Sequence, residues 1–377
     1  MQQAHIDFLY LDEEQMIEAG VTDMPSCIDT MEQVLHLLSE GDYLMGGQNG
    51  NSHGVPLTFP QTSPFPGMPL AGEDRRFMAM PAYIGGSFDL VGMKWYGSNI
   101  ANRKQGLPRS ILMVMLNDKN TGAPIAHMSG NLISSYRTGA IPGVGAKYLA
   151  KKDARVLGIF GPGVMARTTL EAFSCVCPEL DTLKIKGRGR KSTESFCAYV
   201  RENFPQFHSI EVCDDLEGFV RGCDLMCFAA TSGSDASQYP LVKENWVKPG
   251  ALICAPASVN FEDDFLTNRC RKVVDNMGLY EAWAEEFPYP TFGPVTIVGT
   301  KFLDLVHEKK IRKSDIKEIG NIVSGKIAGR KNDEEVIVYS VGGMPVEDVA
   351  WGKIVYENAV KKGIGTRLKL WDAPAMG

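Results

Sequence analysis

The sequence lacks a long hydrophobic run and a paired-cysteine motif. No stretch approaches the roughly 20 consecutive apolar residues of a membrane-spanning helix, and the first residues lack the basic and apolar regions of a secretory signal. The 9 cysteines are odd in number, form no Cys-x-x-Cys pair and stand at no metal-ligand spacing from a histidine. The sequence therefore predicts reduced, buried thiols, no metal site and a cytoplasmic location.

Positive charge is also in short supply. Lys and Arg number 39 against 45 Asp and Glu, which gives a formal net charge of -6 at pH 7. Because non-specific nucleic-acid binding needs a basic surface, this composition argues against a nucleic-acid partner. Hydrophobic residues make up 44% and charged residues 22% of the chain, values typical of a globular protein.

Hydrophobic periodicity divides the 377 residues into two regions. The later region alternates short apolar strands with helical segments, which is typical of a doubly wound parallel α/β unit. The earlier region has helical periodicity over 11–45, a Gly- and Pro-rich loop over 46–75 and then strands of a mostly antiparallel sheet. We therefore predict a Rossmann domain at 141–314 and an α+β domain built from both chain ends, 1–140 and 315–377.

A glycine turn opens the predicted Rossmann domain. The apolar strand 156–160 runs directly into Gly161-Pro162-Gly163-Val164-Met165-Ala166, and a helix follows. This context makes the G-x-G-x-x-A pattern a dinucleotide-binding fingerprint rather than a turn without a ligand. Gly161 permits the tight turn, Gly163 lets a pyrophosphate approach the backbone, and Ala166 allows close packing of helix on strand. The N–H groups at the helix start, around Val164 and Met165, are expected to face the phosphates.

The end of the second strand bears on the choice of cofactor. NAD enzymes usually place an acid there to accept from the ribose 2′-OH. Here the segment is Lys186-Gly187-Arg188-Gly189-Arg190-Lys191, with no acid and four basic residues. Such a segment would hold a 2′-phosphate, so the sequence favours NADP(H) as the cofactor, with NAD(H) as the alternative. The structural alternative is a solvated basic turn that binds no phosphate. Further cofactor contacts are predicted after the fourth and fifth strands, at Thr231, Ser232 and Ala255.

Several motifs outside the glycine turn point to one family. They include Met80-Pro81, Gly92-Met93-Lys94, the stretch from Ser129 to Ala140 that contains Arg137-Thr138, and the late Gly342-Gly343-Met344-Pro345-Val346-Glu347-Asp348. Together they resemble the ornithine cyclodeaminase/μ-crystallin family over about residues 75–360. The resemblance implies hydride transfer between a nicotinamide cofactor and the Cα of an α-amino acid or its imine.

The resemblance also implies roles for individual residues. Lys94 matches the family's lysine that contacts the substrate carboxylate and takes part in proton transfer, which suits a partly desolvated lysine. Arg137 matches an arginine between the substrate carboxylate and the cofactor phosphates, and its fork fits a carboxylate bidentately. Thr138 and Arg109 are assigned to the cofactor. The structural alternatives are an exposed strand lysine at position 94 and an ion pair at position 137.

Departures from the family pattern bring in other residues. No arginine stands at the upstream position where the family binds the substrate carboxylate, and His53 or Arg76 is the candidate replacement. Phe77-Met78-Ala79 occupies the place of a glutamate in the cyclodeaminases. The cyclodeaminase aspartate after the fifth strand has no direct counterpart, so Asp263 is the candidate catalytic acid–base group, with Asn260 as the other possibility.

The sequence thus predicts an NADP-dependent enzyme that transfers a hydride at the Cα–N bond of an α-amino acid or cyclic imine. One alternative is a true ornithine cyclodeaminase, which makes proline and ammonia. The other is an NADPH-binding protein without catalysis, against which the retention of Lys94 and Arg137 argues. The resemblance further implies a homodimer formed through the N-terminal sheet, with the substrate bound by the α+β domain.

Overall fold

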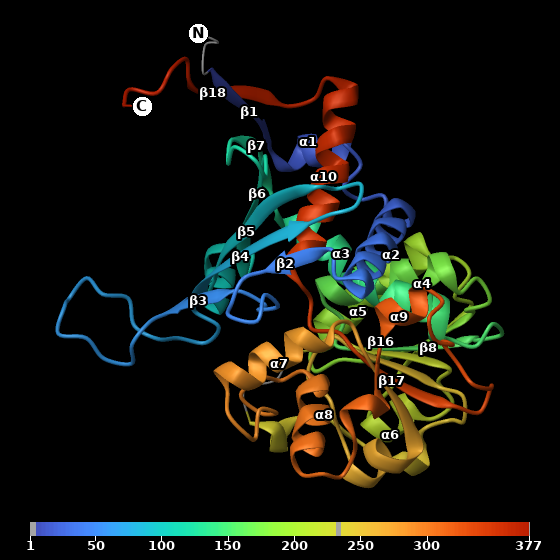
Figure 1. Cartoon of the computed structure of the whole chain (residues 1–377). Helices are drawn as coiled ribbons and strands as arrows, with labels where there is room; N and C mark the ends of the chain where they lie inside the picture. The colour runs from blue at the N-terminus through green and yellow to red at the C-terminus, as the bar shows by residue number, and fades with distance from the viewer. Residues whose placement is uncertain (1–4, 231–234, 377) are drawn as a thin grey trace. The chain divides into compact units, whose positions relative to one another are not determined.

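The computed structural model describes residues 5–230 and 235–376, and the chain divides into two compact units (Figure 1). Unit 1 comprises Met1–Asp23, Gly41–Arg137 and Met344–Gly377. Unit 2 comprises Met24–Glu40 and Thr138–Gly343. The two ends of the chain therefore belong to one unit.

Unit 1 is built on an eight-stranded sheet with strand order β18-β1-β7-β6-β5-β4-β2, and β3 pairs with β4. Every neighbouring pair is antiparallel except β1 and β7. In β4 and β5, buried residues alternate with more exposed ones, because one face of the sheet is covered. The strands are β1 Ile6–Leu11, β2 Tyr43–Met45, β3 Val55–Thr58, β4 Arg76–Ile84, β5 Leu90–Ser98, β6 Ser110–Asn117, β7 Pro124–Ser129 and β18 Thr366–Trp371.

Helix α10 (Pro345–Lys362) covers the buried face of this sheet. The close approach requires glycine on the sheet, since a Cβ at Gly92 would lie 2.9 Å from Val349 Cγ2. The helix carries acids in its first turn and lysines in its last, and it ends at Gly363 in the left-handed conformation, all of which favour a helix with these limits. The other helices of unit 1 are α1 Glu13–Glu18 and the 3-10 helix η1 Ile100–Gln105.

The helical segment predicted over 11–45 is interrupted. Helix α1 is followed by Gly20 at φ 94°, and α2 (Met24–Glu40) is followed by Gly41 at φ 77°. Both glycines adopt the left-handed region that ends helices. Residues beyond Gly41 then form strand β2, so the apolar periodicity marked the helices correctly but not their ends.

Unit 2 is a doubly wound α/β unit, as predicted. Its eight-stranded sheet has the order β10-β9-β8-β11-β13-β17-β15-β16, and all neighbouring pairs are parallel. The central strands β11 and β13 are buried along their whole length, which is typical of a parallel sheet covered on both faces. The strands are β8 Val156–Phe160, β9 Thr182–Lys186, β10 Ser209–Val212, β11 Leu225–Phe228, β13 Leu252–Ala255, β15 Cys270–Val274, β16 Ile316–Glu318 and β17 Val336–Ser340.

Helices connect these strands. Helix α3 (Asn131–Leu149) begins in unit 1 and continues into unit 2. The others are α4 Val164–Val176, α5 Arg190–Asn203, α6 Leu216–Val220, α7 Met277–Glu286, α8 Val298–His307 and α9 Ile319–Val323. Short elements complete the unit: η2 Ala236–Gln238, η3 Glu244–Trp246, η4 Phe265–Arg269, η5 Lys313–Asp315 and a small parallel pair of β12 Leu241–Val242 with β14 Asn260–Phe261.

The unit boundaries differ from the predicted ones at both ends. The segment 315–377 was assigned to the α+β domain, yet β17 lies between β13 and β15 in the parallel sheet. Helix α2, predicted in the first domain, packs on α4 and α9 of unit 2. The prediction ended the Rossmann domain at residue 314, so it had no place for a late apolar strand inside that sheet.

The cysteines are free thiols, as predicted, and all are buried except Cys175. In the described parts of the chain, no helix is both long enough and apolar enough to cross a membrane.

Candidate functional site

Lys94 lies on the covered face of the unit 1 sheet. In β5 it stands beside Met80 of β4 and Val114 of β6, and it is only 2% exposed. The neighbours along the strand alternate between faces, so Tyr96 and Ser98 share its face. An exposed strand lysine is therefore excluded at this position, and a buried ammonium needs partners.

The partners of Lys94 are one acid in the first turn of α10 and one hydroxyl. Lys94 Nζ donates to Asp348 Oδ2 at 2.8 Å and to Ser134 Oγ at 3.4 Å. Arg137 Nε donates to the other carboxylate oxygen, Asp348 Oδ1, at 3.1 Å, and its Nη1 donates to Glu347 Oε2 at 2.7 Å. Asp348 thus bridges the lysine and the arginine, and all four charged groups belong to unit 1. The structure thus brings Lys94 and Arg137 to the same carboxylate.

The electrostatics of this charge cluster follow from its burial. The side chains of Glu347 and Asp348 are fully buried, and that of Arg137 is 7% exposed. Burial, and then the positive charge of Arg137, lower the pKa of Lys94 to about 8, while Asp348 acts in the opposite direction. For Arg137, burial alone would lower the pKa, but Asp348 and Glu347 raise it above its ordinary value. The pKa of Lys94 therefore lies close to neutral pH, so this side chain can gain or lose a proton there, whereas Arg137 stays charged.

Local structure fixes the arginine. Asn131, the first residue of α3, accepts from Leu112 N at 2.9 Å and donates to Ser110 O at 2.9 Å, which ties the start of the helix to β6. Within the described residues, Arg137 Nη2 makes no hydrogen bond. The Nε and Nη1 atoms are held by acids, and the Nη2 edge of the guanidinium remains for a ligand.

Sequence reasoning did not assign roles to the acids or to Ser134. The signal for the acids was present, because Glu347 and Asp348 interrupt an otherwise apolar helix start that is fully buried. Acids so placed are rare unless they are paired. Their partners, however, are about 210 residues or more away in the chain, and only the fold identifies them.

A second cluster of charged side chains lies at the other end of the same sheet face. Asp74 contacts Arg76, and its Oδ2 lies 3.2 Å from Arg109 Nε and accepts from Ser98 Oγ at 2.5 Å. Burial lowers the pKa of Arg76, but Tyr96 and Asp74 raise it more, so the net shift is upward. The structure thus groups Arg76, predicted to bind substrate, with Arg109, predicted to bind cofactor. His53 is half-buried in the segment between β2 and β3, and its predicted role stays a prediction.

The glycine turn of unit 2 has the shape that a dinucleotide requires. Gly161 has φ 88°, and a Cβ there would lie 2.7 Å from Ala230 N, so only glycine fits. A Cβ at Gly163 would meet nothing within 4 Å, which leaves the start of α4 open. Gly163 is the N-cap without a side-chain cap, and Val164 is exposed while Ala166 is buried. The first N–H groups of α4, including that of Met165, therefore fit a phosphate.

Helix α3 packs near this turn within unit 2. Thr138 is half-buried and precedes Gly139, where a Cβ would lie 2.5 Å from the backbone of Thr168 in α4. The predicted contact of Thr138 with the cofactor remains a prediction.

The basic segment after β9 is solvent-exposed. Arg190 pairs with Glu194 at 2.7 Å, whereas Arg188 and Lys191 form no ion pair with any described residue. A Cβ at Gly187 would lie 2.4 Å from Thr193 Oγ1, so this turn is closely packed below its charged surface. Two uncompensated cations at this position fit an anionic group such as a 2′-phosphate.

The remaining predicted residues belong to unit 2, whereas the charge cluster belongs to unit 1. Asp263 pairs with Lys301 at 3.1 Å and with Lys310 at 2.6 Å, and Lys310 first, then Lys301, keep its pKa below the ordinary value. A carboxylate held in this way by two lysines is a weak base. Ala255 is buried at the end of β13. Thr231 and Ser232 lie outside the described residues.

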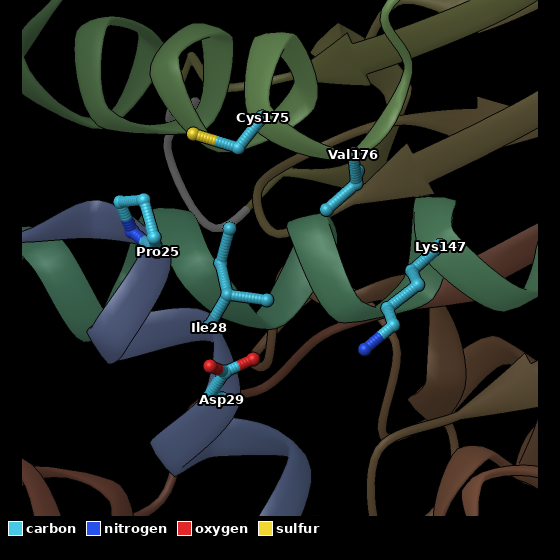
Figure 2. Close-up of a pocket in the computed structure, with 6 residues that line it drawn as sticks. All are labelled: Pro25, Ile28, Asp29, Lys147, Cys175 and Val176. Carbon is cyan, nitrogen blue, oxygen red and sulfur yellow. The ribbon is translucent and has the colours of Figure 1, made fainter.

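The surface groove shown in Figure 2 contains none of the predicted residues. It has a volume of about 340 Å³ and is lined by helices α2, α3 and α4 of unit 2. Its lining residues are Pro25, Ile28, Asp29, Lys147, Cys175 and Val176. Within the described residues, no three His, Cys, Asp or Glu side chains are grouped so that they could hold a metal ion.

Comparison with known proteins places this site in a family. The model of the Ornithine cyclodeaminase/mu-crystallin family matches residues 20–363. Alanine dehydrogenase of Archaeoglobus fulgidus is 29% identical over 309 residues, which are 80% of this chain and 86% of that protein. Delta(1)-pyrroline-2-carboxylate reductase of Bacillus cereus is 28% identical over 304 residues, covering 80% of this chain and 87% of that protein.

A solved structure agrees with these matches. An archaeal alanine dehydrogenase dimer with bound NAD has a TM-score of 0.76 at 27% sequence identity, covering 97% of this chain and 100% of that chain. The predicted fold class and the predicted enzyme class are confirmed, since the curated relatives are dehydrogenases and reductases. The chain belongs to the ornithine cyclodeaminase/mu-crystallin family.

Proposed function

We propose that this chain is an NADP-dependent enzyme that transfers a hydride at the Cα–N bond of an α-amino acid or cyclic imine. The observation that carries the proposal is the buried cluster in which Asp348 bridges Lys94 and Arg137. The reactions named for the relatives, alanine dehydrogenation and pyrroline-2-carboxylate reduction, belong to this class and support it.

The residues of unit 1 supply binding and proton transfer. Arg137 presents its Nη2 edge to the substrate carboxylate, while Glu347 and Asp348 hold the other side of the guanidinium in place. Lys94, with its pKa lowered to about 8, gives a proton to the substrate nitrogen during reduction and takes one back during oxidation. When bound, the nicotinamide supplies the hydride to Cα in reduction and accepts it in oxidation.

The proposed cofactor preference rests on the segment after β9. The related solved structure carries NAD, whereas this chain has Arg188 and Lys191 without ion-pair partners among the described residues and no acid between positions 186 and 191. An acid at that point would repel a 2′-phosphate, and two cations attract it. NADP(H) is therefore the proposed cofactor, with the pyrophosphate at Gly161 and Gly163. A cytoplasmic location is part of the same proposal.

The function is tested by measuring the consumption of NADPH and of NADH with two candidate substrates. These are Δ1-pyrroline-2-carboxylate, and pyruvate together with ammonia. We expect oxidation of NADPH with a lower KM than that of NADH. Removing both free cations (Arg188→Gln with Lys191→Gln) should lower the preference for NADPH about 10- to 100-fold, because hydrogen bonds to a charged phosphate are lost. Arg201→Gln, an exposed charge at the other end of α5, is the matched control and should leave the preference intact.

The same assay separates the alternatives. Conversion of ornithine to proline without net change in NADPH would identify a cyclodeaminase. Tight NADPH binding without any turnover would favour a binding protein. A clear preference of the unmodified enzyme for NADH would contradict the role given to the basic segment.

We also propose a homodimer formed through the uncovered face of the unit 1 sheet. That face carries exposed apolar residues on adjacent strands, and Phe77 stacks on Trp95 with ring centres 5.6 Å apart. Its exposed apolar members are Val55, Leu57, Phe77, Val91, Trp95 and Ile111. Large exposed apolar patches mark interaction sites, and the related alanine dehydrogenase is a dimer.

Light scattering on the purified chain should give the mass of two chains. Trp95→Glu places a charge in the centre of the patch and should shift the mass towards one chain. Leu241→Glu, at a similarly exposed apolar residue of unit 2, is the control and should leave the dimer intact. An unchanged dimer in Trp95→Glu would rule out this face.

A further inference from the structure

The covered face of the unit 1 sheet has a polar end, an apolar middle and a second polar end. At one end, Lys94 pairs with Met80 and belongs to the charge cluster. At the other, Ser98 stands between Arg76 of β4 and Ser110 of β6. Lys94 and Ser98 are four positions apart in β5, which is about 13 Å of strand. The two ends are therefore within reach of one small molecule lying along the sheet.

The middle of this face is apolar and aromatic. Tyr96 lies in register with Met78 on one side and Leu112 on the other, and these three residues pack together with Met80. Tyr96 is 8% exposed. The surface between the two polar ends thus suits methylene groups rather than charge.

The distance between the two polar ends can be bounded from their contacts with the Tyr96 ring. Lys94 Nζ lies 5.8 Å from the ring centre, and the Arg76 guanidinium carbon lies 6.0 Å from the same centre. The two cations are therefore separated by at most twice that length. Allowing about 3 Å for a hydrogen bond at each end leaves at most about 6 Å between a group bound at Lys94 and a carboxylate bound at Arg76. A dicarboxylic α-amino acid of up to about five carbons fits within that length.

The two ends differ in charge balance. In the charge cluster, Lys94 and Arg137 are matched by Glu347 and Asp348, so the group is neutral before a substrate binds. At the far end, Asp74 is the single acid that pairs with both Arg76 and Arg109, among the residues that the structure describes. This end keeps one positive charge in excess. Arg76 and Arg109 are about one-third exposed or more, so an anion from solution reaches them.

We propose that the substrate carries a second carboxylate, bound by Arg76 and Arg109 at the far end of this face. The inference rests on the proposed function, because it assigns the α-carboxylate and the nitrogen to the Arg137 and Lys94 end. The substrate class is then a short dicarboxylic α-amino acid and its imine, with the methylene groups over Tyr96. Arg109 has in this arrangement a substrate role in place of the cofactor role suggested by the family resemblance.

The test compares a dicarboxylate with a monocarboxylate in the same reaction. Reductive amination of 2-oxoglutarate and of pyruvate is followed through NADPH consumption, with ammonia in excess. The unmodified enzyme should have a higher kcat/KM for 2-oxoglutarate. In Arg109→Gln and in Arg76→Gln, the ratio of the two kcat/KM values should fall about 10- to 100-fold, mainly through KM for 2-oxoglutarate. Arg103→Gln, an exposed arginine on η1, removes the same charge and should leave the ratio unchanged.

Three outcomes are decisive. A fall of both kcat/KM values by the same factor in the Arg76 and Arg109 variants would place these residues at the α-carboxylate or in a structural role, and would overturn the inference while the proposed function stands. An equal preference of the unmodified enzyme for both substrates would also overturn it. If no substrate is turned over, the proposed function fails, and calorimetric binding of glutarate decides the inference: binding that is lost in Arg109→Gln supports it, and absent or unaltered binding refutes it.

Discussion

Replacing Lys94 with methionine is expected to lower kcat/KM in both directions by about 10³-fold, which is the contribution of a positioned proton donor and acceptor. The reason lies in the geometry of the charge cluster. Lys94 is the titratable group whose pKa is lowered to about 8 there, so it exchanges a proton with the substrate nitrogen near neutral pH. Methionine fills a similar volume and has no proton to exchange.

The affinity for NADPH shows whether Lys94→Met has lost only its catalytic step or has also lost its fold. The glycine turn and the basic segment belong to unit 2, so fluorescence titration with NADPH should give a similar Kd for Lys94→Met and for the unmodified chain. Lys119→Met is the control, since Lys119 is a partly exposed lysine of unit 1 that pairs with Asp89 at 3.1 Å. Full turnover in Lys94→Met would remove this residue from the mechanism.

Local sequence patterns were sufficient for much of the fold. The strand 156–160, the glycine turn and the helix after it were predicted with limits close to those of β8 and α4, because periodicity and turn chemistry are encoded in adjacent residues. Strand β17 lies in the segment 315–377, which the prediction assigned to the α+β domain. Its partners β13 and β15 lie far back in the sequence, and an apolar run of five residues does not reveal its neighbours.

In the candidate site, too, features encoded in adjacent residues were predictable, and contacts between distant residues were not. Lys94 and Arg137 could be found from motifs, since each stands in a recognisable local stretch. The acids that hold them could not, because Asp348 and Lys94 are 254 positions apart in the chain and meet only in the folded protein. Arg76 and Arg109 were assigned to different ligands, and the structure places both on the same carboxylate of Asp74. Pairing across long separations, rather than residue type, was the missing information.

Replacing Asp348 with asparagine is expected to shift the pH dependence of the reaction and to destabilise the fold. Asparagine keeps the shape of the side chain but removes the charge that opposes the effects of burial and of Arg137 on Lys94. The pKa of Lys94 should then fall below about 8, because the adjacent opposite charge that raises it is lost. Because reduction needs the protonated lysine, its kcat/KM should begin to decline at lower pH than in the unmodified enzyme.

The rate of oxidation below pH 8 should change in the opposite sense to the rate of reduction. Measuring both directions therefore tests the proton-transfer role assigned to Lys94. Oxidation needs the neutral lysine, and its rising limb should also move to lower pH in Asp348→Asn, so that oxidation gains below pH 8 where reduction loses. The free energy of unfolding should fall by about 3 kcal/mol, since a buried ion pair has lost one partner. Glu357→Gln removes an acid from the same helix, where it pairs with Lys353 at 3.1 Å near the surface, and should cost less than about 1 kcal/mol. Parallel loss of both directions without a shift of either limb would mean that Asp348 holds the site together without tuning the lysine.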